Sequence, residues 1–312
     1  MAFLYALPGA VAEGLIWGLM AIGVYISYKI LDIADLTVDG SICTGGCVCA
    51  VLLSVGVPAW ASVLAALLAG MLCGAVTGLL HTRLGIPSIL AGILTQLMLY
   101  SVNLLILSGK SLLPVDPRAN ALLVHMSNNP RSILVMAIAV AATIFILYEF
   151  FYTQVGLTLK SAGDNPDMSR AQGVDVDRNK VIGLAIANGI VAMAGAMLAQ
   201  YKGSANINDG RGAIVIALAA IFIGLSVSLK IKPNFVVSLI GVVSGGIVYY
   251  IVYNFVILLG LKTDYLKMLS AIIVAIFLAV PYLKSEYFTK QKDLHPDALS
   301  AQQTSVGGDD NA

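Results

Sequence analysis

The sequence has 312 residues, of which 59% are hydrophobic and 11% charged, and its mean hydropathy is +0.90. This composition excludes a soluble globular protein and predicts an all-α, polytopic integral membrane protein. The formal net charge of +1 provides no basic surface for nucleic acid, so no nucleic-acid partner is expected.

Apolar stretches long enough to cross a membrane follow one another along the chain. A helix rises about 1.5 Å per residue and the hydrocarbon core is about 30 Å thick, so about 20 apolar residues cross it. The predicted spans cover residues 11–31, 41–55, 59–80, 86–107, 132–151, 181–201, 213–229, 234–261 and 265–283. We expect about eight to ten transmembrane or re-entrant helices in a single domain, residues 1–290. Residues 291–312 have few apolar side chains and are predicted to form a disordered cytoplasmic tail.

The positions of Lys and Arg predict the orientation. The N-terminal stretch MAFLYALPGAVAEG has no Lys or Arg, so it lacks the basic region of a cleaved signal peptide. With the N-terminus outside, Lys29, Arg83 and the charged segment 156–180 all lie in the cytoplasm, as the positive-inside rule requires. The C-terminus is then cytoplasmic as well.

Three acidic residues, Asp32, Asp35 and Asp39, lie between the first two spans in LDIADLTVDG. A short solvated loop explains them without a ligand. A broken helix is the alternative: Thr37, Asp39 and Ser41 then cap a half-helix whose N-terminus faces a pathway, and the carboxylates attract an ammonium group. The second interpretation places Asp35 and Asp39 on a substrate path.

Small residues recur inside the spans. Glycines at four-residue spacing in GMLCGAVTG, Gly70, Gly74 and Gly78, allow two helix backbones to approach closely, either within the bundle or at a dimer contact. The cysteines lack a CxxC pair and a nearby His, so they are predicted to be packing residues and no metal site is expected. They are Cys43, Cys47, Cys49 and Cys73.

Polar residues inside a span are costly and need a partner, water or a ligand. Gln96, Tyr100 and Asn103 share one helical stripe, so they line either a helix contact or a substrate pathway. Tyr250 and Asn254 form a weaker pair of the same kind, because Tyr is also common at membrane interfaces.

The segment 156–180 reads GLTLKSAGDNPDMSRAQGVDVDRNK and carries too many charges for hydrocarbon. Asp164, Asn165 and Pro166 form a helix start signal, and Gly173 is a C-terminal stop, so a short helix over residues 167–172 is predicted. Two interpretations are open: an ordinary loop between membrane helices, or a docking element for a soluble partner.

Several of these stretches resemble one family. LKSAGDNPDMSRAQGV, followed by ANGIVAMAGAMLAQYKG, is similar to the coupling-loop region of ABC transporter permeases of the branched-chain amino acid/ribose superfamily. ILDIADLTVDGSICTGG and IPSILAGILTQLMLYSVNLLI resemble its tryptophan/tyrosine, or aromatic amino acid, subgroup. The resemblance runs from about Gly14 to about Tyr282 and favours the broken-helix interpretation of the DLTVDG stretch.

The resemblance implies a multi-pass permease subunit of a bacterial cell membrane that imports a small solute, an aromatic or other amino acid. It implies a second copy of the chain, a cytoplasmic ATPase dimer that binds ATP and Mg, an extracytoplasmic substrate-binding protein or lipoprotein, and contact with membrane lipid. No cofactor is expected in this chain. The residues assigned to ATPase coupling are Lys160, Asp164, Asn165, Pro166, Met168, Arg170, Ala171 and Gly173.

Other functions fit less well. Gly109, Lys110 and Ser111 end like a phosphate-binding loop, but Leu104 stands where that motif needs glycine, and no enzyme motif appears. An ion-coupled secondary transporter stays an alternative, but the buried acids are too few and too close to the ends of spans to favour a proton relay. An ABC permease for a nucleoside or sugar satisfies the same residues and stays an alternative.

Overall fold

The computed structural model describes residues 2–115, 122–126, 129–228 and 234–258, together with residues 268, 271, 272, 275 and 279. The predicted tail, residues 291–312, lies outside the described residues, and so does most of the last predicted span, residues 265–283.

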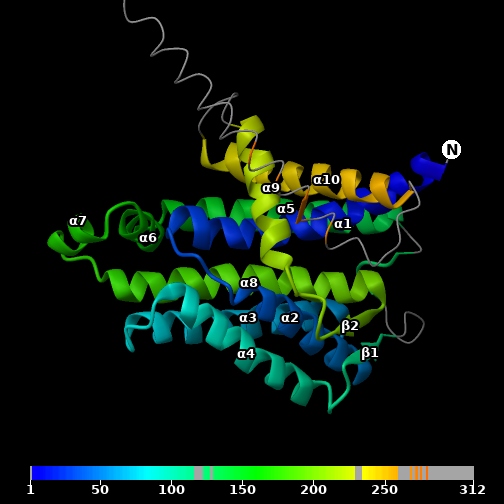
Figure 1. Ribbon diagram of the computed structural model, residues 1–312, viewed down its shortest axis with the longest axis horizontal. Helices are drawn as coiled ribbons and strands as arrows, with labels where there is room; N and C mark the ends of the chain where they lie inside the picture. Colours follow the sequence, from blue (N-terminus) through cyan, green and yellow to red (C-terminus); the bar gives the residue numbers. More distant parts are fainter. Residues whose placement is uncertain are drawn as a thin grey trace, which may run out of the picture.

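Long apolar helices dominate the fold, which confirms the predicted all-α membrane protein (Figure 1). Within the described residues, six helical segments are long and apolar enough to cross a membrane. The helices concerned are α1 (Ala2–Tyr25), α3 (Ala59–Thr82), α4 (Ser88–Ile106), α5 (Asn129–Tyr152), α8 (Val176–Lys202) and α10 (Phe235–Leu258). The first of them continues into a π-helical turn, η1 (Ile26–Ile30). The predicted spans agree with these helices and differ mainly at the ends.

Two shorter apolar helices, α2 (Val38–Ser54) and α9 (Ala213–Ser228), each follow a stretch of non-helical chain. Their N-termini meet inside the fold, where the side chain of Asp39 in the first turn of α2 accepts hydrogen bonds from the start of α9. In Figure 1, α9 runs across the direction of the long helices. The expectation that one or two of the shorter spans do not cross as simple helices fits this arrangement.

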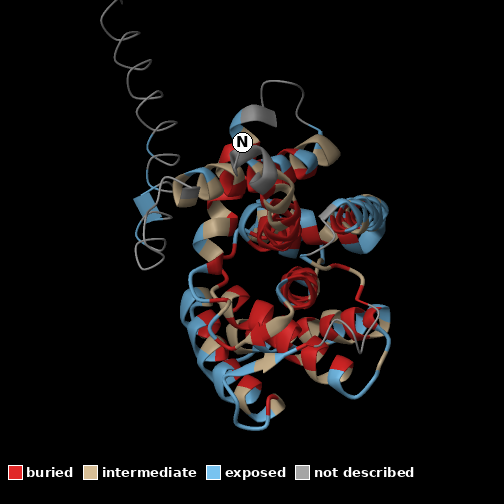
Figure 2. Cartoon of the chain, turned by 90° about the vertical axis from the view of Figure 1, so that its right-hand side faces the viewer, coloured by how far each residue is buried: buried red, intermediate tan, exposed pale blue. Residues whose placement is uncertain are grey.

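The helices pack in two groups joined by α8. One group contains α2, α3 and α4, and the other contains α1, α5, α9 and α10, while α8 contacts α1, α2 and α3 (Figure 1). Figure 2 looks along the helices and shows buried residues in the centre of each group. A two-stranded antiparallel sheet, in which β1 (Leu112–Pro114) pairs with the distant β2 (Ser204–Asn206), lies at one end of the bundle. Two short helices, α6 (Gln154–Asp164) and α7 (Pro166–Ala171), lie at the other end.

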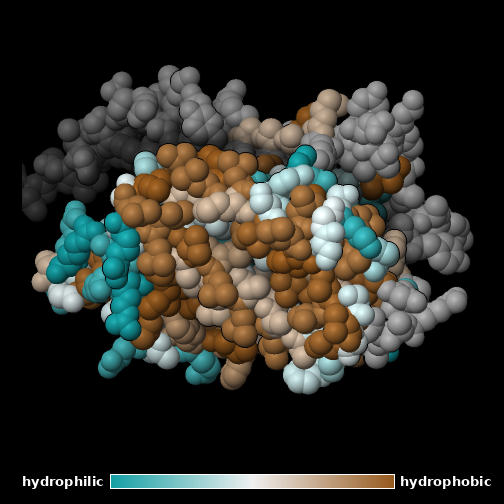
Figure 3. Space-filling view, turned by 90° about the horizontal axis from the view of Figure 1, so that it is seen from below, coloured by the Kyte–Doolittle hydropathy of each residue, from teal (hydrophilic) through white to brown (hydrophobic). Residues whose placement is uncertain are grey.

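A broad apolar surface lies between these two ends. Figure 3 shows this belt on the side of α3 and α4, with hydrophilic residues gathered at the ends. On α3, large exposed side chains recur every four residues, namely Trp60, Leu64, Leu68 and Leu72. A surface of this kind is stable against lipid or another apolar helix and not against water. Which end faces the cytoplasm stays a prediction.

The glycines of GMLCGAVTG bring α3 into backbone contact with α8. A Cβ atom on Gly70 would collide with the carbonyl oxygen of Asn188, and one on Gly74 with that of Leu184. Because lipid offers no hydrophobic drive for helix association, this close approach contributes dispersion contacts to the α3–α8 pair. The structure therefore assigns the motif to packing within the bundle.

We expect Gly74→Val to separate α3 from α8, because its branched side chain would overlap the backbone of Leu184. The free energy of unfolding should fall by about 1–3 kcal/mol. Thermal unfolding of the purified protein in lipid nanodiscs measures the loss. Val76→Leu, which enlarges an exposed side chain of the same helix, is the control and should leave the midpoint unchanged. Equal midpoints for both variants would contradict the assignment.

Candidate functional site

A non-helical segment precedes α2, as both the loop and the broken-helix interpretations predict. The helical part of the first span ends at Ile30, Asp32 adopts a left-handed conformation with φ of 54°, and α2 begins only at Val38. The N-cap residue Thr37 makes no capping bond with its own side chain. Instead, Asp35 Oδ1 accepts from the backbone N–H of Thr37 at 2.9 Å. The predicted capping of α2 by Thr37 is therefore replaced by a bond from Asp35.

A buried amide on α8 holds this break in place. Asn188 Nδ2 donates to Asp35 Oδ2 at 2.6 Å, and Asn188 Oδ1 accepts from the Ser41 hydroxyl at 2.7 Å. Both Asp35 and Asn188 are almost fully buried, so these bonds form away from solvent and are correspondingly costly to lose. The sequence analysis missed Asn188, whose only signal is a lone amide in the small-residue run ANGIVAMAG.

Three buried threonines tie the same break to α3 and α4. The hydroxyls of Thr37 and Thr77 lie 2.7 Å apart, and the Thr77 hydroxyl also lies 3.0 Å from that of Thr95. Short polar side chains on facing helices can share hydrogen bonds in this way without bringing a charge into hydrocarbon. The segment before α2 is thus fixed to three helices.

Asp39 joins the two short helices. Its carboxylate accepts from the backbone N–H groups of Gly212 and Ile214, both at 2.9 Å, and so caps the N-terminus of α9 and not that of α2. A carboxylate is favourable there because the first N–H groups of a helix have no partner within the helix. One turn further along α2, the thiol of Cys43 accepts from Gly210 N–H at 3.0 Å and donates to the Ile207 carbonyl at 3.3 Å.

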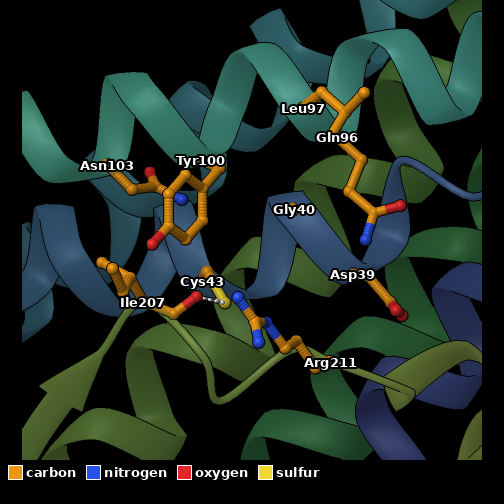
Figure 4. Close-up of a pocket in the computed structure, with 9 residues that line it drawn as sticks. All are labelled: Asp39, Gly40, Cys43, Gln96, Leu97, Tyr100, Asn103, Ile207 and Arg211. Atoms are coloured by element: carbon orange, nitrogen blue, oxygen red, sulfur yellow. Dashed lines mark hydrogen bonds between the residues drawn. The ribbon is translucent and has the colours of Figure 1, made fainter. Parts of the chain in front are cut away.

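A cavity of about 370 Å³ opens beside this junction (Figure 4). The predicted stripe on α4 forms one wall, and the start of α2 and the segment between β2 and α9 form the others. Its lining residues are Asp39, Gly40, Cys43, Gln96, Leu97, Tyr100, Asn103, Ile207 and Arg211. The structure thus brings Gln96, Tyr100, Asn103 and Asp39 together. Asp35 is not among these lining residues and belongs to the buried cluster behind them.

Two residues of this polar cavity lack the usual partners. Asn103 is 1% exposed, yet its side chain forms no hydrogen bond with any residue that the structure describes, and its Oδ1 is fully buried. Arg211 lies with its guanidinium carbon 6.0 Å from the centroid of the Tyr100 ring. The sequence analysis gave Arg211 no role, because its place in the cavity depends on how the chain returns after α8.

A second cavity of about 370 Å³ lies on the other side of Arg211 and is rich in aromatic side chains. The predicted residue Tyr250 lines it together with Trp17 and Tyr253. Lys202 and Asp209 lie on its wall and form an ion pair at 3.3 Å. Asn254, predicted beside Tyr250, donates its Nδ2 to the Tyr250 carbonyl at 3.1 Å within α10 and is not among the lining residues.

The predicted coupling segment forms a compact helical turn at the opposite end of α8. Asn165 Oδ1 caps α7 by accepting from Met168 N–H at 3.0 Å, Pro166 begins the helix, and Gly173 follows with φ of 82°. The outer face of α7 is free of contacts within the described chain at Met168, which is 59% exposed, and Ala171 is exposed beside it.

The sequence analysis missed α6, which runs directly before this turn. The charges of Lys160 and Asp164 favour a loop when the sequence is read alone, and for this reason α6 was not predicted. In the structure, Lys160 lies on the exposed side of α6 and Asp164 is its last residue. The hydroxyls of Ser161 on α6 and Ser169 on α7 lie 2.8 Å apart and join the two helices. Arg170 reaches Asp177 at the start of α8 at 3.5 Å.

An apolar helix bundle with a polar cavity at the N-termini of interrupted helices is typical of membrane transport proteins. The family model described as "Branched-chain amino acid transport system / permease component" matches residues 9–280. The chain belongs to this family and is a multi-pass protein of the bacterial inner membrane. The resemblance identified from the sequence motifs is thereby confirmed.

The relatives include permeases with different solutes. The chain is 37% identical to a tyrosine transport system permease protein of Clostridioides difficile, over 86% of this chain and 88% of that protein. It is 26% identical to a ribose import permease protein of Escherichia coli, over 84% of this chain and 81% of that one. An autoinducer 2 import system permease protein of Yersinia pestis is 31% identical over 66% of this chain and 58% of its own length. No solved structure matches the chain.

We expect Asn188→Leu to destabilise the protein, because it leaves Asp35 and Ser41 buried without their amide partner. The free energy of unfolding should fall by about 2–3 kcal/mol, measured by thermal unfolding in nanodiscs. The double variant Asp35→Leu/Asn188→Leu should recover part of this loss, because it removes the unpaired carboxylate as well. Additive losses in the double variant would show that the two residues do not stabilise the break as a pair.

Proposed function

We propose that this chain is the translocation subunit of an ATP-driven importer of aromatic amino acids, with no ATPase site of its own. Membership of the permease family implies an ATPase and a substrate-binding protein as partners. The observation that carries the proposal is the polar cavity at the N-termini of α2 and α9. The polar cavity brings amide, phenol, carboxylate and guanidinium groups together around one small volume.

The choice of an aromatic amino acid rests on the tyrosine transport relative and on the two adjoining cavities. One cavity offers groups for a charged head group, and the other offers aromatic side chains for a ring. The ribose relative makes a sugar the competing substrate class, because hydroxyl groups also bind amide and carboxylate side chains.

Uptake into proteoliposomes tests the proposal. The permease, its cognate ATPase and its substrate-binding protein are reconstituted, and entry of radiolabelled L-tyrosine, L-leucine and D-ribose is measured with and without ATP. We expect ATP-dependent uptake of tyrosine and little of ribose. Uptake that follows an ion gradient without ATP would instead support the secondary transporter, and ATP-driven ribose uptake would support the sugar permease.

Asn103→Leu is expected to lower ATP-driven uptake and to leave stability unchanged. The side chain of Asn103 has no hydrogen bond to lose in the described structure, so its replacement by an isosteric apolar group leaves no partner unsatisfied. Uptake and thermal unfolding are measured on the same preparation. Ser101→Leu, at an exposed position of the same helix, is the control. A large loss of stability with normal uptake would make Asn103 a packing residue.

The proposal includes two copies of this chain, each with its α7 docked on one ATPase subunit. Support comes from the capped, rigid form of α7 and from the exposure of Met168 and Ala171 at its outer face. The exposed ion pair of Arg170 with Asp177 and the hydrogen bond between the Ser161 and Ser169 hydroxyls join α7 to α8 and α6, which is the route proposed here for transmitting a displacement of the ATPase to the membrane bundle.

Met168→Asp with Ala171→Asp should abolish co-purification of the ATPase while the permease stays folded, because two buried charges at the contact would lose their hydration. Met126→Asp, at an equally exposed methionine outside α6 and α7, should keep the ATPase bound. The mass of the intact complex should correspond to two permeases and two ATPases. Normal co-purification of the ATPase with the double variant argues against docking through α7, and a complex with one copy of each argues against the pair.

A further inference from the structure

Arg211 is the one residue that lines both cavities with a positive charge free of an acidic partner. It belongs to the lining of the polar cavity and of the aromatic cavity, defined here as the second cavity around Trp17, Tyr250 and Tyr253. A solute that occupied both cavities would therefore have its middle part beside Arg211. Figure 4 shows its side chain beneath Tyr100, on the polar side.

The charged residues other than Arg211 that line the two cavities have partners within the chain. Both oxygens of Asp39 accept from backbone N–H groups of α9, and Asp209 pairs with Lys202. With the described residues, the Arg211 side chain forms no ion pair and no hydrogen bond, and its guanidinium lies near the ring of Tyr100. A guanidinium without a carboxylate partner leaves its planar set of N–H donors available.

The backbone that carries Arg211 is held on both sides. Gly212 N–H donates to Asp39, Gly210 N–H donates to Cys43, and Arg211 N–H donates to the Asn208 carbonyl at 3.2 Å. The backbone of the turn that carries the guanidinium is thus held by hydrogen bonds, although the Arg211 side chain itself is exposed. A fixed donor loses less entropy on binding than one on a mobile loop, which favours a binding role.

The aromatic cavity provides a surface for a ring. Trp17 and Tyr250 are stacked with centroids 5.8 Å apart, and Tyr250 and Tyr253 lie 5.6 Å apart with their planes inclined by 51°. Aromatic rings prefer offset-stacked and edge-to-face contacts at separations of this order, so these side chains beside a cavity of about 370 Å³ favour an aromatic ligand. A hydroxyl-rich sugar would gain less binding free energy than an aromatic ring from contact with such a surface.

The polar cavity carries an independent sign of a ligand. Asn103 lines it, is 99% buried and has an amide oxygen with no hydrogen-bond partner in the described chain. A buried polar atom without a partner costs free energy unless a ligand or water satisfies it. A zwitterionic head group, which carries both donors and acceptors, would do so.

We propose that Arg211 binds the carboxylate of the transported amino acid while the ring of the solute packs in the aromatic cavity. This inference rests on the proposed function, because it assigns the recognition of the substrate in the same site. The guanidinium forms two parallel N–H···O bonds to a carboxylate, and this paired geometry makes the contact selective for the acid over its amide.

Binding to the full-length permease in lipid nanodiscs tests this directly. The chain has two tryptophans, Trp17 in the aromatic cavity and Trp60 on the apolar surface of α3, so Trp60→Phe leaves Trp17 as the single fluorescent reporter. Its emission is followed during titration with L-tyrosine, and then with L-tyrosinamide, which has the same ring and amino group but no carboxylate. Tyrosine should bind at least about tenfold more tightly than the amide.

Arg211→Gln should weaken tyrosine binding by about tenfold to a hundredfold and leave the weak binding of tyrosinamide unchanged. Arg211→Lys, which keeps the charge and loses the planar fork, should give an intermediate affinity. Lys110→Gln removes an exposed positive charge outside both cavities and should change neither affinity. Should Arg211→Gln fail to fold, Arg211→Lys tests the same residue, because an unchanged preference for tyrosine over tyrosinamide in that variant would overturn the inference.

Equal binding of acid and amide, or an equal weakening of both by Arg211→Gln, would overturn the inference. ATP-driven tyrosine uptake by the wild-type transporter in that case leaves the proposed function standing and shows that Arg211 does not recognise the carboxylate. If the wild-type transporter imports ribose and not tyrosine, and Trp17 does not respond to tyrosine, the proposed function and the inference fail together.

Discussion

The structure depends on satisfying backbone N–H groups that lie inside an apolar bundle. α2 begins among buried residues, and α9 begins beside the polar cavity. Two aspartates supply acceptors at these starts: Asp35 for the N–H of Thr37, the N-cap residue of α2, and Asp39 for the N–H groups of Gly212 and Ile214 at the start of α9. These carboxylates reduce the cost in free energy of interrupting the chain there.

The same bonds that stabilise the break also place the chemical groups of the site. Asp39 and Cys43 fasten the turn that carries Arg211, and Asn188 fixes Asp35 from α8. α8 begins next to α7 and carries Asn188, which bonds Asp35, before it reaches the β1–β2 strand pair. One continuous helix therefore joins the proposed ATPase contact to the cluster that holds the segment before α2.

Several elements were predictable because their physical cause is local. Apolar runs define the spans, Asn165, Pro166 and Gly173 define the bounds of α7, and helical spacing puts Gln96, Tyr100 and Asn103 on one stripe. The helix α6 was missed because its charged residues resemble those of a loop, although it packs on α7 and α8. The role of Arg211 was missed because nothing in its neighbours along the chain indicates which cavity it lines.

The sequence by itself determined the class of fold, the membrane spans, the break before α2 and the family, since all of these follow from local composition, periodicity and motifs. Only the tertiary structure decided that Asp39 caps α9, that Asn188 meets Asp35 and that Arg211 lies between two cavities. These contacts join residues more than 100 positions apart. Their formation depends on how whole helices pack, and the pattern of side chains along a single helix does not specify that packing.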